Sequence, residues 1–202
     1  MGDLSKFQNV VQFYAFHIAL VLLFVSEIFI FIYSYQKQKE KRNYYDKGTK
    51  WLLEINYIFS VCFPFWCVSK KSPTFFEYFL LPYWTAYIGI LAIIIGIIIR
   101  VIAVLTLKKA FTLNVQTTDK QVLVTTGIYT KVRNPAYSGS ILSLIGVALA
   151  LRNIFSVILI FLISIICYSI RIYVEEQALI KHFKKDFMNY QKHTYKLFPY
   201  IW

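Results

Sequence analysis

The stretch from Ile88 to Leu105 decides the fold, because it reads IGILAIIIGIIIRVIAVL and holds a single charged residue, Arg100. A helix needs about 20 apolar residues to cross the hydrocarbon core of a bilayer. With its flanks, the apolar segment 83–107 is long enough. The composition agrees, since the 202-residue chain is 58% hydrophobic and only 16% charged. Such values are typical of a membrane protein.

Four further apolar runs lie outside this stretch, at 10–33, 51–68, 137–151 and 154–173. Together the five runs predict an all-α integral membrane protein with five transmembrane helices. Only Arg152 and Asn153 separate the last two runs, so these should form a tight helical hairpin. Because neither an internal repeat nor a linker is visible, we expect residues 1–202 to form one membrane-embedded domain.

Most of the 22 basic residues fall into three segments, 37–50, 108–133 and 171–196. Lysine and arginine accumulate in cytoplasmic loops, and five helices place all three segments on one side. We therefore expect the N-terminus outside and the active face in the cytoplasm, in a prokaryotic plasma membrane. The net charge of +12 then reflects orientation and attraction to anionic lipids, and does not indicate nucleic acid.

The three cysteines, Cys62, Cys67 and Cys167, lie inside predicted spans. They show neither the CxxC nor the Cys/His spacing of a zinc site, and no disulfide framework is apparent. The sequence therefore predicts no metal.

One candidate for chemistry is the segment 111–139, FTLNVQTTDKQVLVTTGIYTKVRNPAYSG, which is long for a connector between packed helices. Asn134 suits a helix N-cap, and Pro135 suits the first helical turn. The positive end of that helix could also hold an anionic ligand. From the residues alone, a structural role and a binding role both stay open.

A second candidate is RIYVEEQALIKHF, 171–183. Arg171 and Glu175 are four residues apart, on one helix face, where an exposed ion pair contributes only a few tenths of a kcal/mol. At the membrane border, however, such a charge can hold a charged ligand. The following segment 176–190 is predicted to form an amphipathic helix, either on the membrane surface or over the site. One of its faces would carry Leu179, Phe183, Phe187 and Tyr190.

Two features inside the predicted spans have structural consequences. Small residues at helical spacing in 137–151 should allow close helix packing; they are Gly139, Ser143, Gly146 and Ala150. Glu27 and Arg100 each lie about 10 Å below the cytoplasmic border by helical rise. Because charges at that depth seek partners or water, we expect them to pair or to face a cavity.

Taken together, VLVTTGIYTKVRNPAY (122–137) and the segment 171–202 resemble the membrane methyltransferases of the isoprenylcysteine carboxyl methyltransferase group, which are related to phospholipid methyltransferases. That group shows an LVTSGVY…RHPxY loop, a helical hairpin, R-x-x-x-E-E and a tail like HFGEEYxEY…PF. The match begins near Arg100. It departs at Asn134, where the group has histidine, and in the tail, where FKKDF replaces FGEEY.

The resemblance implies S-adenosylmethionine as cofactor. It implies O-methylation of the carboxylate of a lipophilic, isoprenylcysteine-like substrate, either a small molecule or a lipidated one. Membrane lipids are the other implied partners. It implies that Arg171 and Glu175 are catalytic, with Arg171 binding the substrate and Glu175 the amino acid portion of the cofactor. The other implied cofactor-binding residues are Gln116, Gln121, Val122, Leu123, Val124, Tyr129, Asn134, Pro135, Ala136 and Tyr137.

Methyl transfer from a sulfonium mainly needs alignment, and a carboxylate acceptor is already ionised at neutral pH. An amine acceptor must first lose a proton, for which Glu175 or Glu176 would serve as base. The alternatives are therefore a phospholipid or amine N-methyltransferase, an NADPH-dependent membrane reductase, and a non-catalytic scaffold or small channel.

Overall fold

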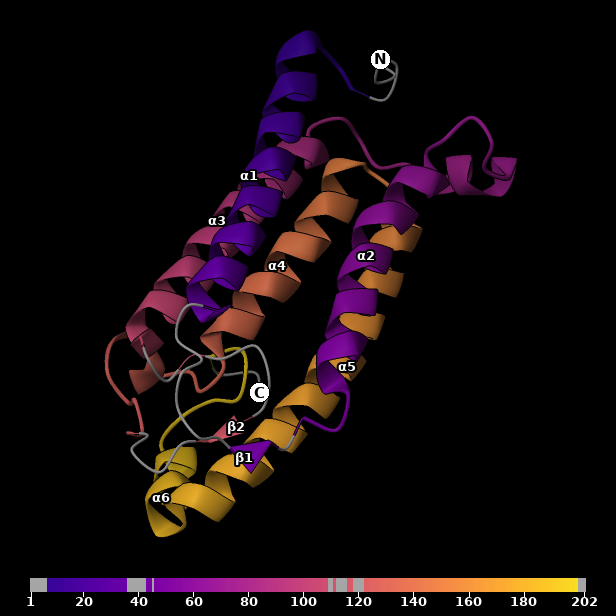
Figure 1. Ribbon diagram of the computed structural model, residues 1–202. Helices are drawn as coiled ribbons and strands as arrows, with labels where there is room; N and C mark the ends of the chain where they lie inside the picture. The colour runs from indigo at the N-terminus through magenta and orange to yellow at the C-terminus, as the bar shows by residue number, and fades with distance from the viewer. Residues whose placement is uncertain are drawn as a thin grey trace.

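The computed structural model describes residues 7–35, 43–44, 46–108, 111, 116–117 and 122–199. Five long helices lie side by side as a bundle (Figure 1). They are α1 (Val10–Tyr35), α2 (Thr49–Cys67), α3 (Thr85–Leu107), α4 (Pro135–Ala150) and α5 (Ile154–Phe183). Each corresponds to one of the five apolar runs, with ends shifted by no more than two residues except at the C-terminal end of α5.

Shorter elements close the two ends of the bundle. The 3-10 helix η2 (Thr74–Phe79) lies at the end that holds the start of α1, while α6 (Lys185–Lys192) lies at the other end (Figure 1). A further 3-10 helix, η4 (Gly127–Thr130), precedes α4. The strands β1 (Asn43–Tyr44) and β2 (Gln116–Thr117) pair antiparallel near α6, so the fold is not purely helical.

The surface of the bundle is that of an integral membrane protein. Helices α1, α3 and α5 are each long and apolar enough to cross a bilayer, and α4 is a shorter apolar helix. Large apolar side chains point outward on the three long helices, among them Val21, Leu91 and Ile166. A surface of this kind is stable against lipid and would aggregate in water.

Helix α4 is the central element and contacts all four other long helices. Its side chains at Ile141, Leu144 and Val147 are completely buried. Because α4 is surrounded by protein, its 16 residues need not match the thickness of the lipid. Its first turn is therefore held in a fixed place at the end of the bundle near α6.

The seam between α3 and α4 is built on glycines, as the small residues of α4 predicted. A Cβ placed on Gly96 would lie 2.5 Å from the carbonyl oxygen of Gly139, and one on Gly146 would lie 2.8 Å from that of Gly89. Such distances are too short for any side chain. The backbones of α3 and α4 are therefore in direct contact. In a membrane the hydrophobic effect does not drive helices together, because lipid is as apolar as the helices, so close packing of this kind holds them together.

The predicted hairpin between α4 and α5 is confirmed. Arg152 adopts a left-handed conformation with φ of 64°, and its Nε donates to the carbonyl of Leu81 at 2.8 Å. Asn153 caps α5, since its side chain accepts from the backbone N–H of Ser156 at 2.9 Å. These bonds satisfy polar groups at a turn that is otherwise buried.

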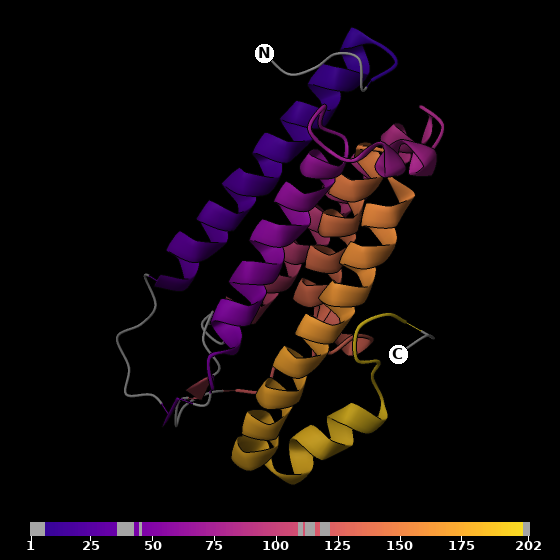
Figure 2. The same ribbon diagram turned by 90° about the vertical axis from the view of Figure 1, so that its right-hand side faces the viewer.

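The predicted helix over 176–190 is not a separate element, because its residues divide between α5 and α6. The point at which the last span leaves the membrane, expected at 173, stays a prediction. Helix α5 continues without a break to Phe183, and the chain turns at Lys184, where φ is 51°. Figure 2 shows α6 folding back across the end of the bundle. The polar residues after 173 include strong helix formers such as Glu, Gln, Ala and Leu, so helical structure outlasts the apolar run.

The glycine seam predicts the effect of adding one carbon. Gly96→Ala places a methyl group against backbone atoms of α4, which cannot move aside without shifting the helix. We therefore expect the free energy of unfolding to fall by about 1 to 3 kcal/mol. Val25→Ile adds one carbon on the outer surface of α1, where Val25 is exposed, and serves as the control. Thermal unfolding in detergent measures both. Equal melting temperatures would show that α3 and α4 do not depend on this contact.

Candidate functional site

The N-terminus of α4 lies where the site is built. Pro135 is its first residue and Asn134 its N-cap position, as predicted, but the Asn134 side chain makes no capping bond. The Asn134 amide instead donates to the carbonyl of Lys196 at 3.0 Å, and the hydroxyl of Ser138 donates to the carbonyl of Leu197. Both side chains therefore hold the C-terminal tail against α4.

Arg133 is the centre of this attachment. Its Nε lies 3.0 Å from a carboxylate oxygen of Glu176, and both side chains are about nine-tenths buried. Its Nη1 donates to the carbonyl of Gln191 at 3.0 Å and to that of Thr194. A guanidinium satisfied in this way joins the segment before α4 to both α5 and the tail. Sequence reasoning counts Arg133 only among the basic residues that indicate orientation and misses this attachment.

A cavity of about 90 Å³ forms between this segment and the end of α5; we call it the loop pocket. Most of the predicted cofactor residues line it: Val122, Leu123, Val124, Tyr129, Asn134, Ala136, Tyr137 and Glu175. Pro135 is buried at the start of α4 and is not part of the lining. Gln121 and the side chain of Gln116 lie outside the described residues.

The C-terminal region covers the loop pocket. Leu179, Phe183, Phe187 and Tyr190, the predicted apolar face, all line it, although they come from two helices, α5 and α6. Of the two alternatives left open for this face, the structure has the one in which it covers the site. The apolar wall would exclude water from whatever binds there.

Two tyrosines close the pocket with fixed hydroxyls. Tyr129 donates to the carbonyl of Ala103 at 3.3 Å, and Tyr190 donates to the backbone carbonyl of Tyr129 at 2.6 Å. Burial raises the pKa of Tyr190 to about 12 and raises the pKa of Tyr129 well above its ordinary value. Both remain protonated donors at neutral pH, so these bonds persist.

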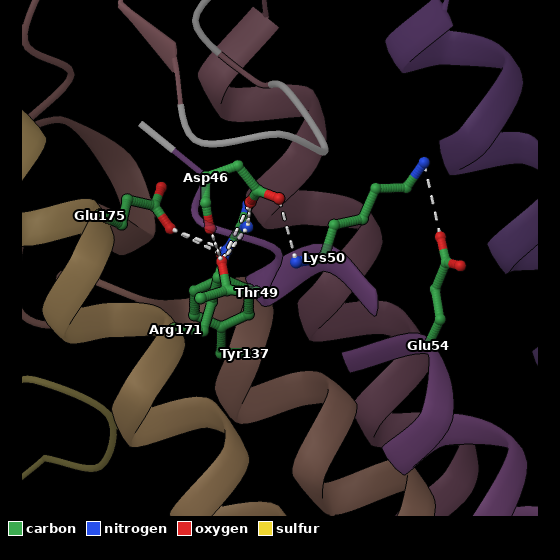
Figure 3. Close-up of polar contacts among 7 residues, drawn as sticks. All are labelled: Asp46, Thr49, Lys50, Glu54, Tyr137, Arg171 and Glu175. Carbon is green, nitrogen blue, oxygen red and sulfur yellow. Dashed lines mark hydrogen bonds and ion pairs between the residues drawn. The ribbon is translucent and has the colours of Figure 1, made fainter. Parts of the chain in front are cut away.

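Arg171 contacts two residues of the loop-pocket lining, Tyr137 and Glu175, and is only 2% exposed. Its Nε donates to the hydroxyl of Tyr137 at 3.1 Å, and that hydroxyl donates to Glu175 at 2.6 Å. The direct ion pair from Arg171 to Glu175 is longer, at 3.8 Å. Figure 3 shows the three side chains converging from α4 and α5. Tyr137 thus connects the two residues that the resemblance made catalytic.

The strongest partners of Arg171 come from the start of α2 and were missed by sequence reasoning. Nη1 forms an ion pair with Asp46 and donates to the Thr49 hydroxyl at 2.9 Å (Figure 3). Asp46 also accepts from the Thr49 hydroxyl at 3.0 Å and from the Lys50 backbone at 3.3 Å. The N-cap position of α2 is Gly48, and the Asp46 carboxylate, two residues earlier, satisfies a backbone N–H of the first helical turn. An acidic residue just before a helix could have suggested this role. The contact of Asp46 with Arg171, far away in the sequence, has no local signal.

A second cavity of about 370 Å³ extends from Arg171 and Tyr137 between the helices; we call it the membrane cavity. Apolar side chains such as Ile30, Leu53 and Ile58 contribute much of its wall. Phe111, Ala136 and Tyr137 line both this cavity and the loop pocket. The two cavities therefore meet at the first turn of α4.

The predicted pair of membrane charges is confirmed. Arg100 and Glu27 form a two-point ion pair, with Nε and Nη2 of the guanidinium 2.7 and 2.8 Å from the two carboxylate oxygens. Both residues line the membrane cavity, so both expected arrangements occur together. Nη1 of Arg100 donates to the Ser140 hydroxyl, which ties α1 and α3 to α4.

The arrangement provides one chamber with mixed polar and apolar walls at the end of the bundle, one largely apolar chamber between helices, and a buried cation at their junction. A ligand in the first can meet the charged head of a lipid in the second. Among the described residues, no three His, Cys, Asp or Glu side chains gather as a metal ion would require, and the absence of a metal stays a prediction.

Comparisons with known proteins point to one group. The chain is 33% identical in sequence to the protein-S-isoprenylcysteine O-methyltransferase of Saccharomyces cerevisiae, in an alignment that covers 62% of this chain and 54% of that protein. The Tribolium castaneum protein of the same name is 31% identical, over 66% of this chain and 50% of that protein. The chain spans between about half and two thirds of the length of such relatives. These relatives are eukaryotic and give no support to the predicted prokaryotic origin.

A solved structure shares the fold. Isoprenylcysteine carboxyl methyltransferase, described as a eukaryotic intramembrane Ras methyltransferase, superposes with a TM-score of 0.62 and 29% sequence identity. The superposition covers 74% of this chain and 52% of that one. The resemblance seen in the motifs is thus confirmed in three dimensions.

The family model for phospholipid methyltransferases matches residues 84–186, which is just over half of the chain. The matched region runs from α3 through α4 and the Arg171–Glu175 turn of α5. It contains most of the loop pocket and all the residues at the junction except those from the start of α2. The chain therefore belongs to the phospholipid methyltransferase family.

Proposed function

We propose that the protein is an S-adenosylmethionine-dependent membrane methyltransferase that acts on the carboxylate of a lipophilic, isoprenylcysteine-like acceptor. The observation that carries the proposal is the chain of contacts from Arg171 through Tyr137 to Glu175, which stands where the loop pocket meets the membrane cavity. The names of the relatives support the same reaction class.

The chemistry of the loop pocket fits the cofactor. Glu175 offers a carboxylate to an ammonium group, Asn134 and Tyr137 offer polar atoms, and Leu179 and Phe183 offer apolar surface to a nucleoside. The cofactor would supply an electrophilic methyl group on a positively charged sulfur. Ligand sites commonly measure about 300 to 1,000 Å³. The described walls enclose only about 90 Å³, so binding has to widen this pocket.

Arg171 would hold the acceptor. A guanidinium can donate to both oxygens of a carboxylate, which fixes the plane of the group. Tyr137 receives the Arg171 Nε bond and so keeps the guanidinium aimed at the junction. Because the acceptor is already ionised at neutral pH, alignment is the main demand on the protein.

Asp46 limits how strongly Arg171 attracts an anion. Its carboxylate already pairs with Nη1, so an acceptor carboxylate shares a partly neutralised guanidinium. Weak ground-state binding of the head leaves most of the affinity to the lipid tail in the membrane cavity. The product ester, which is uncharged, would lose its hold on Arg171 and leave.

An amine acceptor is the alternative. The family match to phospholipid methyltransferases favours it, and so does the presence of two carboxylates, Asp46 and Glu175, beside Arg171. The Glu175 side chain is 33% exposed, so it could accept a proton from an amine at the junction. In that case Glu175 would act as base, and Arg171 would bind another part of the lipid head.

We further propose that the single domain crosses the membrane five times, through α1 to α5, with its N-terminus outside. The three basic segments support this orientation, because β1, β2 and α6 lie together at one end of the bundle (Figure 1). Lys70 and Lys71 follow α2 at the opposite end. The prokaryotic plasma membrane stays a prediction, as does the absence of nucleic acid among the partners.

Cofactor binding and turnover should separate in two variants. Glu175→Gln removes a charged partner of the cofactor and should weaken S-adenosylmethionine binding ten- to a hundred-fold, since hydrogen bonds to charged groups contribute about 1.5 to 3 kcal/mol. Arg171→Lys keeps the charge and loses the fork, so turnover should fall about ten-fold or more while cofactor affinity holds. Calorimetry in detergent and a methyl-transfer assay measure the two effects.

Glu77→Gln makes the same change as Glu175→Gln on η2, at the far end of the bundle, and should alter neither quantity. Binding of NADPH without binding of S-adenosylmethionine would contradict the proposed reaction and support the reductase. Unchanged turnover in Arg171→Lys would remove this residue from acceptor binding.

Orientation can be measured with matched lysine replacements. In a background without native cysteines, Lys71→Cys and Lys185→Cys each expose one thiol, since both lysines are exposed. A membrane-impermeant maleimide added to intact cells should label Lys71→Cys, and should label Lys185→Cys only after permeabilisation. The reverse pattern would invert the topology, and equal labelling in intact cells would exclude an odd number of spans between α2 and α6.

A further inference from the structure

The membrane cavity has a polar patch that the proposed reaction does not use. Glu27 of α1, Tyr57 of α2 and Arg100 of α3 all line the wall. A fully apolar tail, such as an unsubstituted hydrocarbon chain, has no polar atom to offer these groups. Polar residues at membrane depth are expensive and usually mark a functional site.

The ion pair by itself has a structural explanation, since it joins α1 to α3 and, through Ser140, to α4. It is not sealed off, however, because the Glu27 side chain is 25% exposed. Each carboxylate oxygen has two acceptor positions, and Arg100 uses one on each. Glu27 can therefore accept a further hydrogen bond from a group inside the cavity.

Tyr57 supplies the independent observation. Its hydroxyl is buried and has no hydrogen-bond partner in the part of the chain that the structure describes. A buried hydroxyl left unsatisfied costs about 1 to 3 kcal/mol. The ring lies in the cavity wall, and a small movement of the side chain would bring the hydroxyl into contact with a bound molecule.

We propose that the acceptor lipid carries a hydroxyl group on its tail, which accepts a hydrogen bond from Tyr57 and donates one to Glu27. A hydroxyl is the smallest uncharged group that donates and accepts at once. This inference rests on the proposed function, because it assigns the membrane cavity to the tail of the methyl acceptor. It differs from that proposal in one respect, since it replaces a purely hydrocarbon isoprenyl tail by a hydroxylated one.

The position of the hydroxyl follows from α2. Thr49 contacts Arg171, the residue proposed to hold the carboxylate, and Tyr57 lies eight residues further along the same helix. At 1.5 Å per residue the two positions are about 12 Å apart along the helix axis. The tail hydroxyl should thus lie roughly 12 Å from the carboxylate.

A positional series tests this subsite. The probes are long-chain carboxylic acids of one length, each with a single hydroxyl at a successive carbon, together with the unsubstituted acid. The dependence of the melting temperature on probe concentration gives the Kd for each, and methyl-ester formation is followed separately. We expect one hydroxyl position to bind at least ten-fold more tightly than the unsubstituted acid.

Tyr57→Phe should reduce that ratio to about one. Tyr14→Phe, the same change on an exposed side chain of α1 outside the cavity, should keep it. A Kd that does not vary along the series, or an optimum that survives in Tyr57→Phe, would overturn the inference.

The experiment separates failure of the hydroxyl subsite from failure of carboxyl methylation. An optimum that is lost in Tyr57→Phe, without ester formation, would support the subsite and reject carboxyl methylation. Ester formation without an optimal hydroxyl position would support carboxyl methylation and reject the subsite.

Discussion

The buried guanidinium of Arg171 is the interaction on which the rest of the site depends. A cation that is 2% exposed at the edge of a membrane bundle is stable only when charged and polar partners surround it. Those partners come from three separate elements: Asp46 and Thr49 before and in α2, Tyr137 on α4, and Glu175 one turn further along α5. Satisfying one charge therefore fixes the relative position of three helices.

The scaffold behind this charge is rigid for a physical reason. Glycines let the backbone of α3 touch that of α4, and α4 is covered by helices on its other sides. Tyr137, in the first turn of α4, consequently has little freedom to move. Because Tyr137 lines both cavities, a fixed α4 keeps the loop pocket and the membrane cavity in a constant relative position. Alignment of two reactants is the contribution that methyl transfer asks of a protein.

Sequence patterns predicted what depends on periodicity and on local chemistry. The five apolar runs correspond to five helices, and the Glu27–Arg100 pair follows from helical depth alone, since isolated charges in a membrane must find each other. The motif residues Val122 to Val124 and Tyr137 line one pocket, and their binding of the cofactor, which the resemblance implies, stays a prediction.

What sequence could not predict depends on distant contacts. No local sequence pattern predicts the contact between Asp46 and Arg171, and none predicts the contact between Arg133 and the tail carbonyls that it binds. Asn134 is of a residue type that favours helix caps, but its side chain makes no capping bond and its amide N–H donates to the carbonyl of Lys196. The continuation of α5 to Phe183 was not predicted for another reason. The apolar run ends at the membrane border, whereas residues with high helix propensity continue beyond it.

The central claim is that the cation at the junction presents a carboxylate to the methyl donor. It is tested most directly by the chemical stability of the product formed from labelled S-adenosylmethionine and a lipophilic acid. An ester hydrolyses in mild base and releases the label as volatile methanol, whereas a methylated amine keeps it. We expect base-labile label, formed about ten-fold or more slowly in Arg171→Lys. Base-stable label on an amine-bearing lipid would contradict this claim and would assign the junction to N-methylation.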